Sequence, residues 1–593
     1  MSVQFAVPEE AAVVSHDPIE LQVVRQRLVA IPNLIEKNVE RTAFSLLVQE
    51  YKDFAIGFVD PKGHLVTQSR YSLPGFVANA LGLGVREALK VFGGANLHEG
   101  DVVLVNGYVI GKHLNDVVAL TPVRCDGDLI GFFAVLVHWI DVGGRVVGSC
   151  LSPDATDIWQ EGLQLSTVKL MSRGERVDDI YRIVLANSRF PDLLAGDLQA
   201  QLGGCFMGRD MVHEVIADHG VHAVKAAIRE MQDDASAASA RAIAELPKGV
   251  FKASSFLDDD GINLGVRLAV EAVVTVDERG LTIDLSGLNE QVLGPINLSF
   301  DGGAVTFARV AAKVLLAPGT PVNEADFDHV HVIAPVGRFM SARPGAAMGQ
   351  GGFNGPTIVD TIFRALAAAI PDRIPAGHHG TFGIHQITGT NRFGEPFLSL
   401  DAMSGGWGAF SNADGPNALR SITHGDVRDV PVEIQEALYP YRIEAKRLVQ
   451  DSGGAGRHRG GLGVEKIYAF PSTKRLRCNI TVERTECAPW GVADGQDGAT
   501  PLVELRSADG NRRLLRKSDV ELNQGDVLRV VSGGGGGYGA GYFRDVESVL
   551  ADVRDGYVSQ ESALRDYGVI LNGQGDIDQP ATAAMRDKLL SGA

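Results

Sequence analysis

The chain has 593 residues, of which 45% are hydrophobic and 22% charged, so it is too long for one simple core and two to four domains are expected. Its formal net charge of −18 argues against a nucleic-acid binder and against binding to an anionic membrane surface. Five cysteines without a C-x-x-C pair argue against a disulfide scaffold or a structural zinc knuckle, and favour a reducing cytoplasm.

Residues 1–16 are expected to form a loose arm. They lack the basic region and apolar core that are typical of a secretory signal. No apolar run in the chain approaches the roughly 20 residues that span a bilayer. The sequence therefore predicts a cytoplasmic protein without a membrane span.

Residues 1–248 are predicted to form an α/β domain. Asp17 caps a helix that begins at Pro18 and continues to about Gln49, with a kink or a break at Pro32. Alternating or β-branched runs predict strands at 51–60, 65–67, 117–120 and 132–137. Further helical stretches are expected at 76–93 and 175–246.

Residues 249–438 are predicted to form an α+β domain with glycine-rich loops. Residues 266–276 alternate in character, turn at 277–280 and return over 281–285, which predicts a β-hairpin. Helices are expected at 302–316 and 358–369. The remaining part, 439–593, is predicted to be β-rich, so the fold class is α+β, multidomain, with mixed or antiparallel sheets.

The stretch 106–144 carries the strongest functional signal. His113 and Asp116 stand just before one predicted strand, and His138 follows the next. Two adjacent strands would bring these side chains to one end of a sheet. Imidazole and carboxylate groups in a dry site are ligands for Zn, Mn or Fe, so the sequence predicts a divalent metal with open coordination positions. The alternative is that these residues cap turns or pack in the core.

This stretch resembles the hydantoinase B/5-oxoprolinase family, which also includes the large subunits of acetone and acetophenone carboxylases. The family pattern N-D-P-Y-x-G-G-x-H-x-x-D, followed by A-H-H-x-D-V-G-G, is similar to Asn106–Asp116 and to His138–Gly144. The resemblance implies that His113, Asp116 and His138 bind a divalent metal. It also implies a hydantoinase B-like fold.

The similarity extends from about residue 17 to 570, and includes D-S-G-G-A-G at 451–456 and S-G-G-G-G-G-Y-G at 532–539. Three departures from the family pattern point to an altered pocket. They are Gly107-Tyr108 in place of Asp-Pro, Trp139 in place of a second histidine, and His424 within a segment that resembles T-N-T-x-x-x-P-V-E.

Further site residues follow from the resemblance. A family aspartate near the metal matches Asp53, which becomes a fourth candidate ligand; the alternative is a turn or an arginine partner. Glu161 lies in a segment that resembles I-x-Q-E-G, and Asp141 or Glu161 is a candidate for proton transfer; the alternative for Glu161 is a structural salt bridge. The backbone amides of Gly143-Gly144 or Gly405-Gly406 could hold an oxyanion.

Two other patterns suggest binding sites. His378, His379 and His385 could form a second metal site, but they lack a matching carboxylate at regular spacing. The run Gly533–Gly537 is not followed by Gly-Lys-Ser/Thr, so it is not a nucleotide P-loop. Close approach of its backbone to another segment or to a ligand is the better explanation.

No Walker motif occurs in the chain, so any ATP is expected to be bound by another polypeptide. The resemblance implies a hetero-oligomer in which a hydantoinase A-like ATPase subunit phosphorylates a small-molecule substrate. The favoured interpretation is the metal-dependent subunit of an ATP-dependent cyclic amide hydrolase that opens a hydantoin, a lactam or 5-oxoproline. The alternatives are the large subunit of an ATP-dependent ketone carboxylase and a non-catalytic scaffold subunit.

Overall fold

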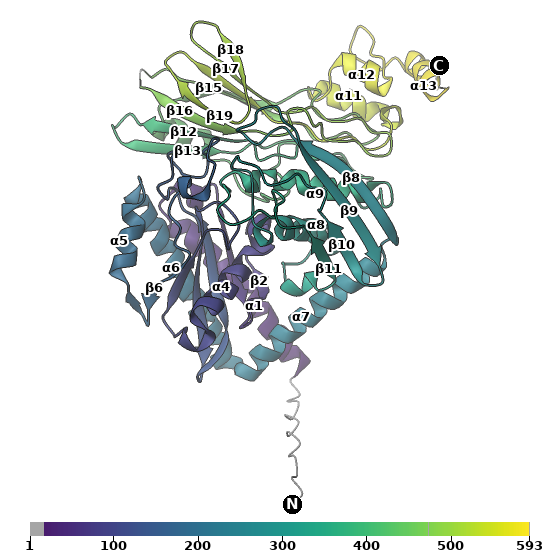
Figure 1. The fold of residues 1–593 in the computed structure, drawn as a ribbon. Coiled ribbons are helices and arrows are strands. Elements are labelled where there is room, and N and C mark those ends of the chain that lie inside the picture. Colours follow the sequence, from purple (N-terminus) through teal and green to yellow (C-terminus); the bar gives the residue numbers. More distant parts are fainter. Residues whose placement is uncertain (1–16, 473, 592–593) are drawn as a thin grey trace, which may run out of the picture.

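The computed structural model describes residues 17–472 and 474–591, so the arm predicted at residues 1–16 lies outside the described residues. Within these ranges the chain forms four sheets interleaved with helices, which confirms the predicted α+β class with mixed and antiparallel sheets (Figure 1). The first two parts of the chain share one continuous apolar cluster. No helix in the described ranges is long and apolar enough to cross a bilayer.

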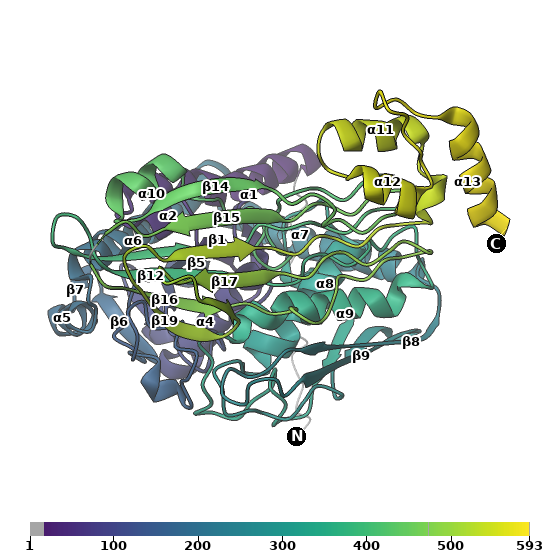
Figure 2. The ribbon, with the colours of Figure 1, turned by 90° about the horizontal axis from the view of Figure 1, so that it is seen from above.

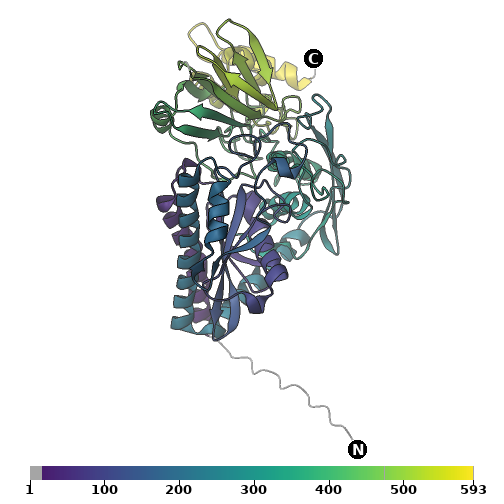
Figure 3. The ribbon, with the colours of Figure 1, turned by 60° about the vertical axis from the view of Figure 1, so that its left-hand side comes forward.

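The first sheet is antiparallel, with the strand order β2-β1-β5-β4-β3-β6-β7. Its long strands β4 (Asp116–Cys125) and β5 (Asp128–His138) pair with each other and place Asp116 opposite His138. Most of their side chains are buried because α6 (Pro191–His219) covers one face of the sheet and α4 (Ala80–Phe92) the other (Figure 3). The shorter strands are β1 (Phe54–Val59), β2 (Leu65–Gln68), β3 (Val102–Val105), β6 (Thr167–Ser172) and β7 (Glu175–Arg176).

The N-terminal helix α1 (Pro18–Thr42) differs from its prediction. It continues through Pro32 and stops at Thr42, so the expected continuation to Gln49 is wrong. The chain turns there because the backbone N–H groups of residues 44–45 donate to Asp197 Oδ1 on α6, at 2.8 and 2.9 Å. The other helices of this part are α2 (Leu46–Gln49), α3 (Pro74–Val77), α5 (Asp178–Ala186) and α7 (Val221–Ala244).

The second sheet has the order β11-β10-β9-β8 and contains the predicted hairpin, which is confirmed. Strands β9 (Leu268–Asp277) and β10 (Gly280–Asp284) pair antiparallel, and β11 (Val330–Ile333) joins β10 in parallel. Helix α9 (Gly355–Ala367) packs on β8 (Gly249–Leu257) and β9. Alternate residues of β9 are buried under α9, and the residues between them face away from it. A π-helical turn leads into α8 (Thr306–Leu316) beside α9.

The third and fourth sheets pack face to face over a common apolar cluster, as in a β-sandwich (Figure 2). Their orders are β13-β12-β16-β19 and β14-β15-β20-β17-β18. Strand β12 pairs with β13 on one side and β16 on the other, so residues from both sides of the predicted domain boundary at 438 share one sheet. The strands are β12 (Ile384–Thr390), β13 (Pro396–Asp401), β14 (Arg442–Leu448), β15 (Val464–Ala469), β16 (Leu476–Thr481), β17 (Leu502–Arg506), β18 (Arg512–Leu515), β19 (Ser518–Leu522) and β20 (Val527–Val531).

Helix α10 (Val432–Leu438) precedes the fourth sheet, and three helices follow it. The three helices lie together beside one end of the sandwich (Figures 1 and 2). They are α11 (Val546–Arg554), α12 (Gln560–Tyr567) and α13 (Gln579–Ser591).

The glycine run Gly533–Gly537 is buried among other extended glycine segments. The N–H of Gly406 donates to the carbonyl of Gly533 at 2.9 Å, and the N–H of Gly454 donates to that of Gly535 at 2.8 Å. The N–H of Gly535 in turn donates to the carbonyl of Gly461 at 2.9 Å. These bonds confirm the predicted close approach of this backbone to other segments, which only residues without a Cβ permit.

Candidate metal centre

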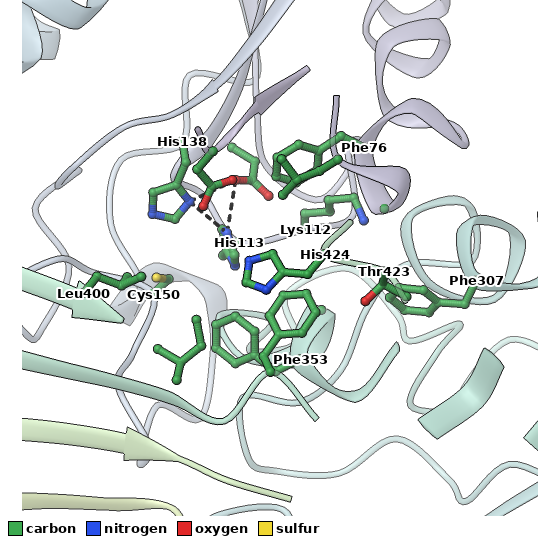
Figure 4. Close-up of a pocket in the computed structure, with 17 residues that line it drawn as sticks. Phe76, Lys112, His113, His138, Cys150, Phe307, Phe353, Leu400, Thr423 and His424 are labelled. Carbon is green, nitrogen blue, oxygen red and sulfur yellow. Dashed lines mark hydrogen bonds and ion pairs between the residues drawn. The ribbon is translucent and has the colours of Figure 1, made fainter. Parts of the chain in front are cut away.

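Three side chains meet at the end of the first sheet. Asp116 begins β4, His138 ends β5, and His113 lies in the loop that enters β4 (Figure 4). Asp116 Oδ1 is 3.1 Å from His113 Nε2 and 3.1 Å from His138 Nδ1. The two ring nitrogens are themselves 3.1 Å apart. The residues predicted from the sequence therefore converge on one point.

Hydrogen bonds alone do not account for this triangle. The carboxylate oxygen only accepts, so each ring nitrogen needs a proton to bond it, and the two N–H groups would then face each other. A cation removes the conflict because it takes lone pairs from all three atoms. Nitrogen and oxygen ligands that share one ion at about 2.0–2.2 Å lie roughly 3 Å or more apart, so the observed separations of 3.1 Å are compatible with a shared cation.

The surrounding electrostatics also suit a cation. Burial alone would raise the pKa of Asp116, but the adjacent imidazoles of His113 and His138 hold it well below its usual range. Burial raises the pKa of Asp53 to about 7, an effect that His138 opposes and Asp116 reinforces. Among the described residues, Asp116 Oδ2 and Asp53 Oδ1 are buried and have no hydrogen-bond partner. A bound cation would compensate such unpaired oxygens.

Cys150 is a neighbouring donor that was not predicted from the sequence. Its Sγ and one ring nitrogen from each of His113 and His138 all lie within 4.8 Å of one another. Burial, followed by the charge of Asp116, raises the pKa of this thiol well above its usual value. Nothing in the spacing of a lone cysteine indicated this position, because the loop after β5 brings it back to the histidines.

A cavity of about 50 Å³ opens beside these groups. Its wall is mainly apolar and comes from several distant segments. The apolar side chains that line the cavity include Phe76, Phe307, Phe353, Phe382, Ile384 and Leu400 (Figure 4).

Besides Asp53 and Cys150, the polar residues Lys112, Thr423 and His424 line the cavity. Burial lowers the pKa of Lys112 to about 8, and the charge of Asp116 acts in the opposite direction. Burial, followed by the charge of Arg420, lowers the pKa of His424 well below its usual value, so this ring is neutral. His424 Nε2 is 3.1 Å from the Tyr51 hydroxyl. His424 was identified from the sequence only as a departure from the family pattern.

Asp141 and Glu161, the two residues predicted to transfer protons, do not line this cavity. Asp141 accepts from the N–H of Gly148 at 3.0 Å, and its carboxylate also holds the loop at Arg189. Glu161 accepts from the N–H groups of residues 348–349 at 2.8 and 2.7 Å. Burial raises the pKa of Glu161 to about 8, although these N–H groups act in the opposite direction. Both carboxylates therefore order loops next to the site.

Three of the four predicted oxyanion amides already have hydrogen-bond partners. The N–H of Gly405 donates to the Leu419 carbonyl at 2.7 Å, and that of Gly406 donates to the Gly533 carbonyl at 2.9 Å. The N–H of Gly144 donates to Ser149 Oγ at 3.2 Å. The expectation that the N–H groups of Gly144, Gly405 and Gly406 hold an oxyanion is therefore wrong.

The second metal site considered for His378, His379 and His385 is not among the metal-type groups of the described residues. His378 Nδ1 is 3.3 Å from Asp360 Oδ1, and His385 Nε2 is 2.7 Å from the Tyr468 hydroxyl, so the two histidines have separate partners. In the part of the chain that the structure describes, the metal-type cluster is the one at His113 and His138.

Comparisons of sequence and of structure with known proteins agree with each other. The family model for hydantoinase B/oxoprolinase matches residues 17–541. The B-type chain of a putative D-/L-hydantoinase from Pseudomonas sp. (strain NS671) is 29% identical over 96% of this chain and 98% of its own length. The crystal structure of ATP-dependent caprolactamase from Pseudomonas jessenii superposes with a TM-score of 0.88 at 27% identity, covering 97% of this chain and all of that one. Nucleotide-free acetone carboxylase shares the fold, with a TM-score of 0.87 at 19% identity, over 97% of this chain and 83% of that one.

Proposed function

The chain belongs to the hydantoinase B/oxoprolinase family, and from this we propose that it is the metal-dependent subunit of an ATP-dependent cyclic amide hydrolase. The names of its relatives support the reaction class, because hydantoins and caprolactam are both cyclic amides. The observation that carries the proposal is the triangle of His113, Asp116 and His138 beside a mainly apolar cavity.

A partner subunit completes the proposed enzyme. The hydantoinase and caprolactamase relatives are each named as one of the subunits of their enzyme, which indicates assemblies with a second kind of chain. We propose a hydantoinase A-like ATPase as this partner, since the present sequence has no Walker motif. Phosphorylation of the amide oxygen in the partner would turn a poor electrophile with a poor leaving group into an activated one. The present chain would then complete the ring opening.

The residues of this chain have separate roles in that step. His113, Asp116 and His138 would hold a divalent Zn, Mn or Fe ion, with Asp53 and Cys150 beside them. Such an ion supplies Lewis acidity that activates water or an amide oxygen. Asp53 Oδ1 has no hydrogen-bond partner among the described residues and lines the same cavity, so it can accept a proton next to the reacting atoms. The apolar wall excludes bulk water from the activated substrate.

The variant His113→Ala tests this proposal. It removes one ligand, so the purified chain should lose stoichiometric metal, and ring opening with the partner should fall more than about 100-fold. ATP consumption by the partner should persist. Metal content by mass spectrometry and product formation with a lactam or hydantoin are the measurements. His331→Ala, an exposed residue far from β4 in the sequence, is the matched control and should change neither.

Other outcomes identify the alternatives. Consumption of bicarbonate and a ketone, dependent on ATP, would indicate a carboxylase in place of a hydrolase. A wild-type chain without stoichiometric metal, whose assembly keeps full turnover after chelation or after the His113→Ala change, would indicate a scaffold role and would overturn the proposal.

A further inference from the structure

We propose that Lys112 and Thr423 form a binding subsite for an anionic group of the substrate. On this inference the cavity takes a cyclic amide that carries a carboxylate or a phosphoryl group. The identity of the ring rests on the proposed function, whereas the charge of the ligand follows from the subsite itself.

The ammonium of Lys112 is buried and makes no salt bridge with a carboxylate of the described residues. The residue is 5% exposed and lines the cavity. Its hydrogen bond from Nζ to the Gly302 carbonyl is long, at 3.5 Å. Among residues 17–472 and 474–591, no carboxylate forms a salt bridge with Nζ, and the charge of Asp116 acts on it only from beyond 4.0 Å. A buried charge is costly unless it is paired, so this position favours a ligand that brings the opposite charge.

The surrounding residues hold the ammonium in place. The rings of Phe76 and Phe307 lie 5.9 and 5.4 Å from Nζ, within cation–π range. The preceding residue, Gly111, has a φ of +68°, and a Cβ there would lie 2.7 Å from the Cα of Gly302. The backbone at 111–112 is therefore clamped against the turn before α8. An anion that enters meets a cation that is already desolvated and oriented, which strengthens their attraction.

Thr423 provides a second donor. Its Oγ1 is buried, lines the same cavity and has no hydrogen-bond partner among the described residues. Its carbonyl is already used, because it accepts from the N–H of Gly75 at 3.1 Å. Figure 4 shows Lys112 and Thr423 on the side of the cavity away from His138 and Cys150. A substrate can therefore place its anionic group at Lys112 and its amide near the metal ligands.

The anion can come from two sources. One is a carboxylate that belongs to the substrate, as on 5-oxoproline, and the other is the phosphoryl group that the proposed partner transfers. Both present oxygens that an ammonium and a hydroxyl bind. Separate binding measurements with a carboxylate ligand and with phosphate distinguish the two sources.

The test is calorimetric binding of three probes to the purified full chain: 5-oxoproline, inorganic phosphate and neutral 2-pyrrolidinone. The variant Lys112→Met keeps the length of the side chain and removes its charge. Affinity for at least one anion should fall 10-fold or more, and Thr423→Val should weaken the same anion less. Affinity for 2-pyrrolidinone should not change. Loss confined to 5-oxoproline identifies the carboxylate, and loss confined to phosphate identifies the phosphoryl group.

Two controls keep the result interpretable. Lys90→Met removes an exposed lysine and should leave all affinities unchanged. Lys112→Arg keeps the charge and should restore anion binding, which separates loss of charge from misfolding. Equal anion affinities in wild type and Lys112→Met, or no anion binding by the wild type, would overturn the subsite.

Metal content separates this inference from the proposed function. Lys112→Met should retain the metal that His113→Ala loses. If His113→Ala keeps metal and turnover while Lys112→Met loses anion binding, the proposed function fails and the subsite stands. If His113→Ala loses metal and turnover while Lys112→Met keeps its anion affinity, the subsite is rejected and the proposed function stands.

Discussion

The three proposed metal ligands converge because β4 begins opposite the residue at which β5 ends. These ligands are His113, Asp116 and His138. Asp116 is the first residue of β4 and stands directly opposite His138, the last residue of β5. Side chains alternate between the two faces of a strand, so a register shift of one residue would turn one of these ligands away. The buried runs that fix this register therefore also fix the metal site.

Glu161→Gln tests a loop that orders the site. A carboxyl group whose pKa rises from 4.5 to about 8 on folding binds its proton more tightly in the folded state, so its contribution to stability is lost as pH rises through this window. The amide cannot ionise, and its Oε1 can still accept from residues 348–349. The free energy of unfolding of wild type relative to Glu161→Gln should fall by roughly 2–4 kcal/mol between pH 5 and 8.5.

Urea unfolding of both proteins at several pH values measures this difference. A difference that stays constant across the range would show that Glu161 is ionised in the folded protein throughout.

The sequence allowed some site residues to be identified and left others hidden. His113, Asp116 and His138 could be predicted because they flank β-branched runs at short range and match a family pattern. Lys112 stands beside His113, but its lack of a salt-bridge partner inside the shared cavity is a property of the folded chain. Cys150 comes to the histidines through a loop whose path no local pattern specifies. Sequence spacing therefore identifies site residues that flank adjacent strands. It misses residues that a loop brings back to the site.

At the scale of elements, α6 shows how glycine sets the distance between a helix and a sheet. A Cβ at Gly208 would lie 2.3 Å from the Phe133 ring on β5, whereas a Cβ at Gly203 would meet nothing within 4 Å. The change Gly208→Ala should therefore destabilise the fold by about 1–3 kcal/mol, because the helix must move away from the sheet. The change Gly203→Ala should stabilise it by about 0.5–1 kcal/mol, since alanine favours the helix interior.

Urea unfolding of the two variants measures both changes in the free energy of unfolding, which should have opposite signs. If both variants changed the free energy of unfolding by the same amount, α6 would be able to move away from the sheet at Gly208 without loss of stability.

Elements were predicted best where their determinants are local. The hairpin at β9 and β10 has its alternation and its turn within one short stretch, and it forms as expected. The end of α1 was wrong because Asp197, far along the chain, captures the backbone at residues 44–45. The partners of Gly533–Gly537 could not be assigned either, since a glycine carries no side chain to indicate what it packs against.

At the scale of the whole molecule, the predicted parts are joined by shared cores. The first two share one apolar cluster, and β12 pairs with β16 across the boundary predicted at residue 438. A chain cut there would expose both strand edges and leave Gly533–Gly537 without its backbone partners. Residues 17–438 and 439–593 should therefore be insoluble or unfolded when expressed separately, and should form a soluble complex only when expressed together.

Solubility and circular dichroism of the fragments test this expectation. Removal of residues 579–593, which deletes α13 and no strand, is the control and should leave a folded protein. Two stable, independently folded fragments would contradict the shared-core description and support separate domains.

The two sides of the cavity have different origins. The metal ligands come from the ends of β4 and β5, whereas much of the facing wall comes from later segments, including Phe353, Phe382 and Leu400. Substitutions in those later segments can reshape the space for a ring without disturbing the reactive groups. A new ring size or substituent could thus be adopted in evolution by altering one half of the pocket, while the chemistry is inherited unchanged through the other.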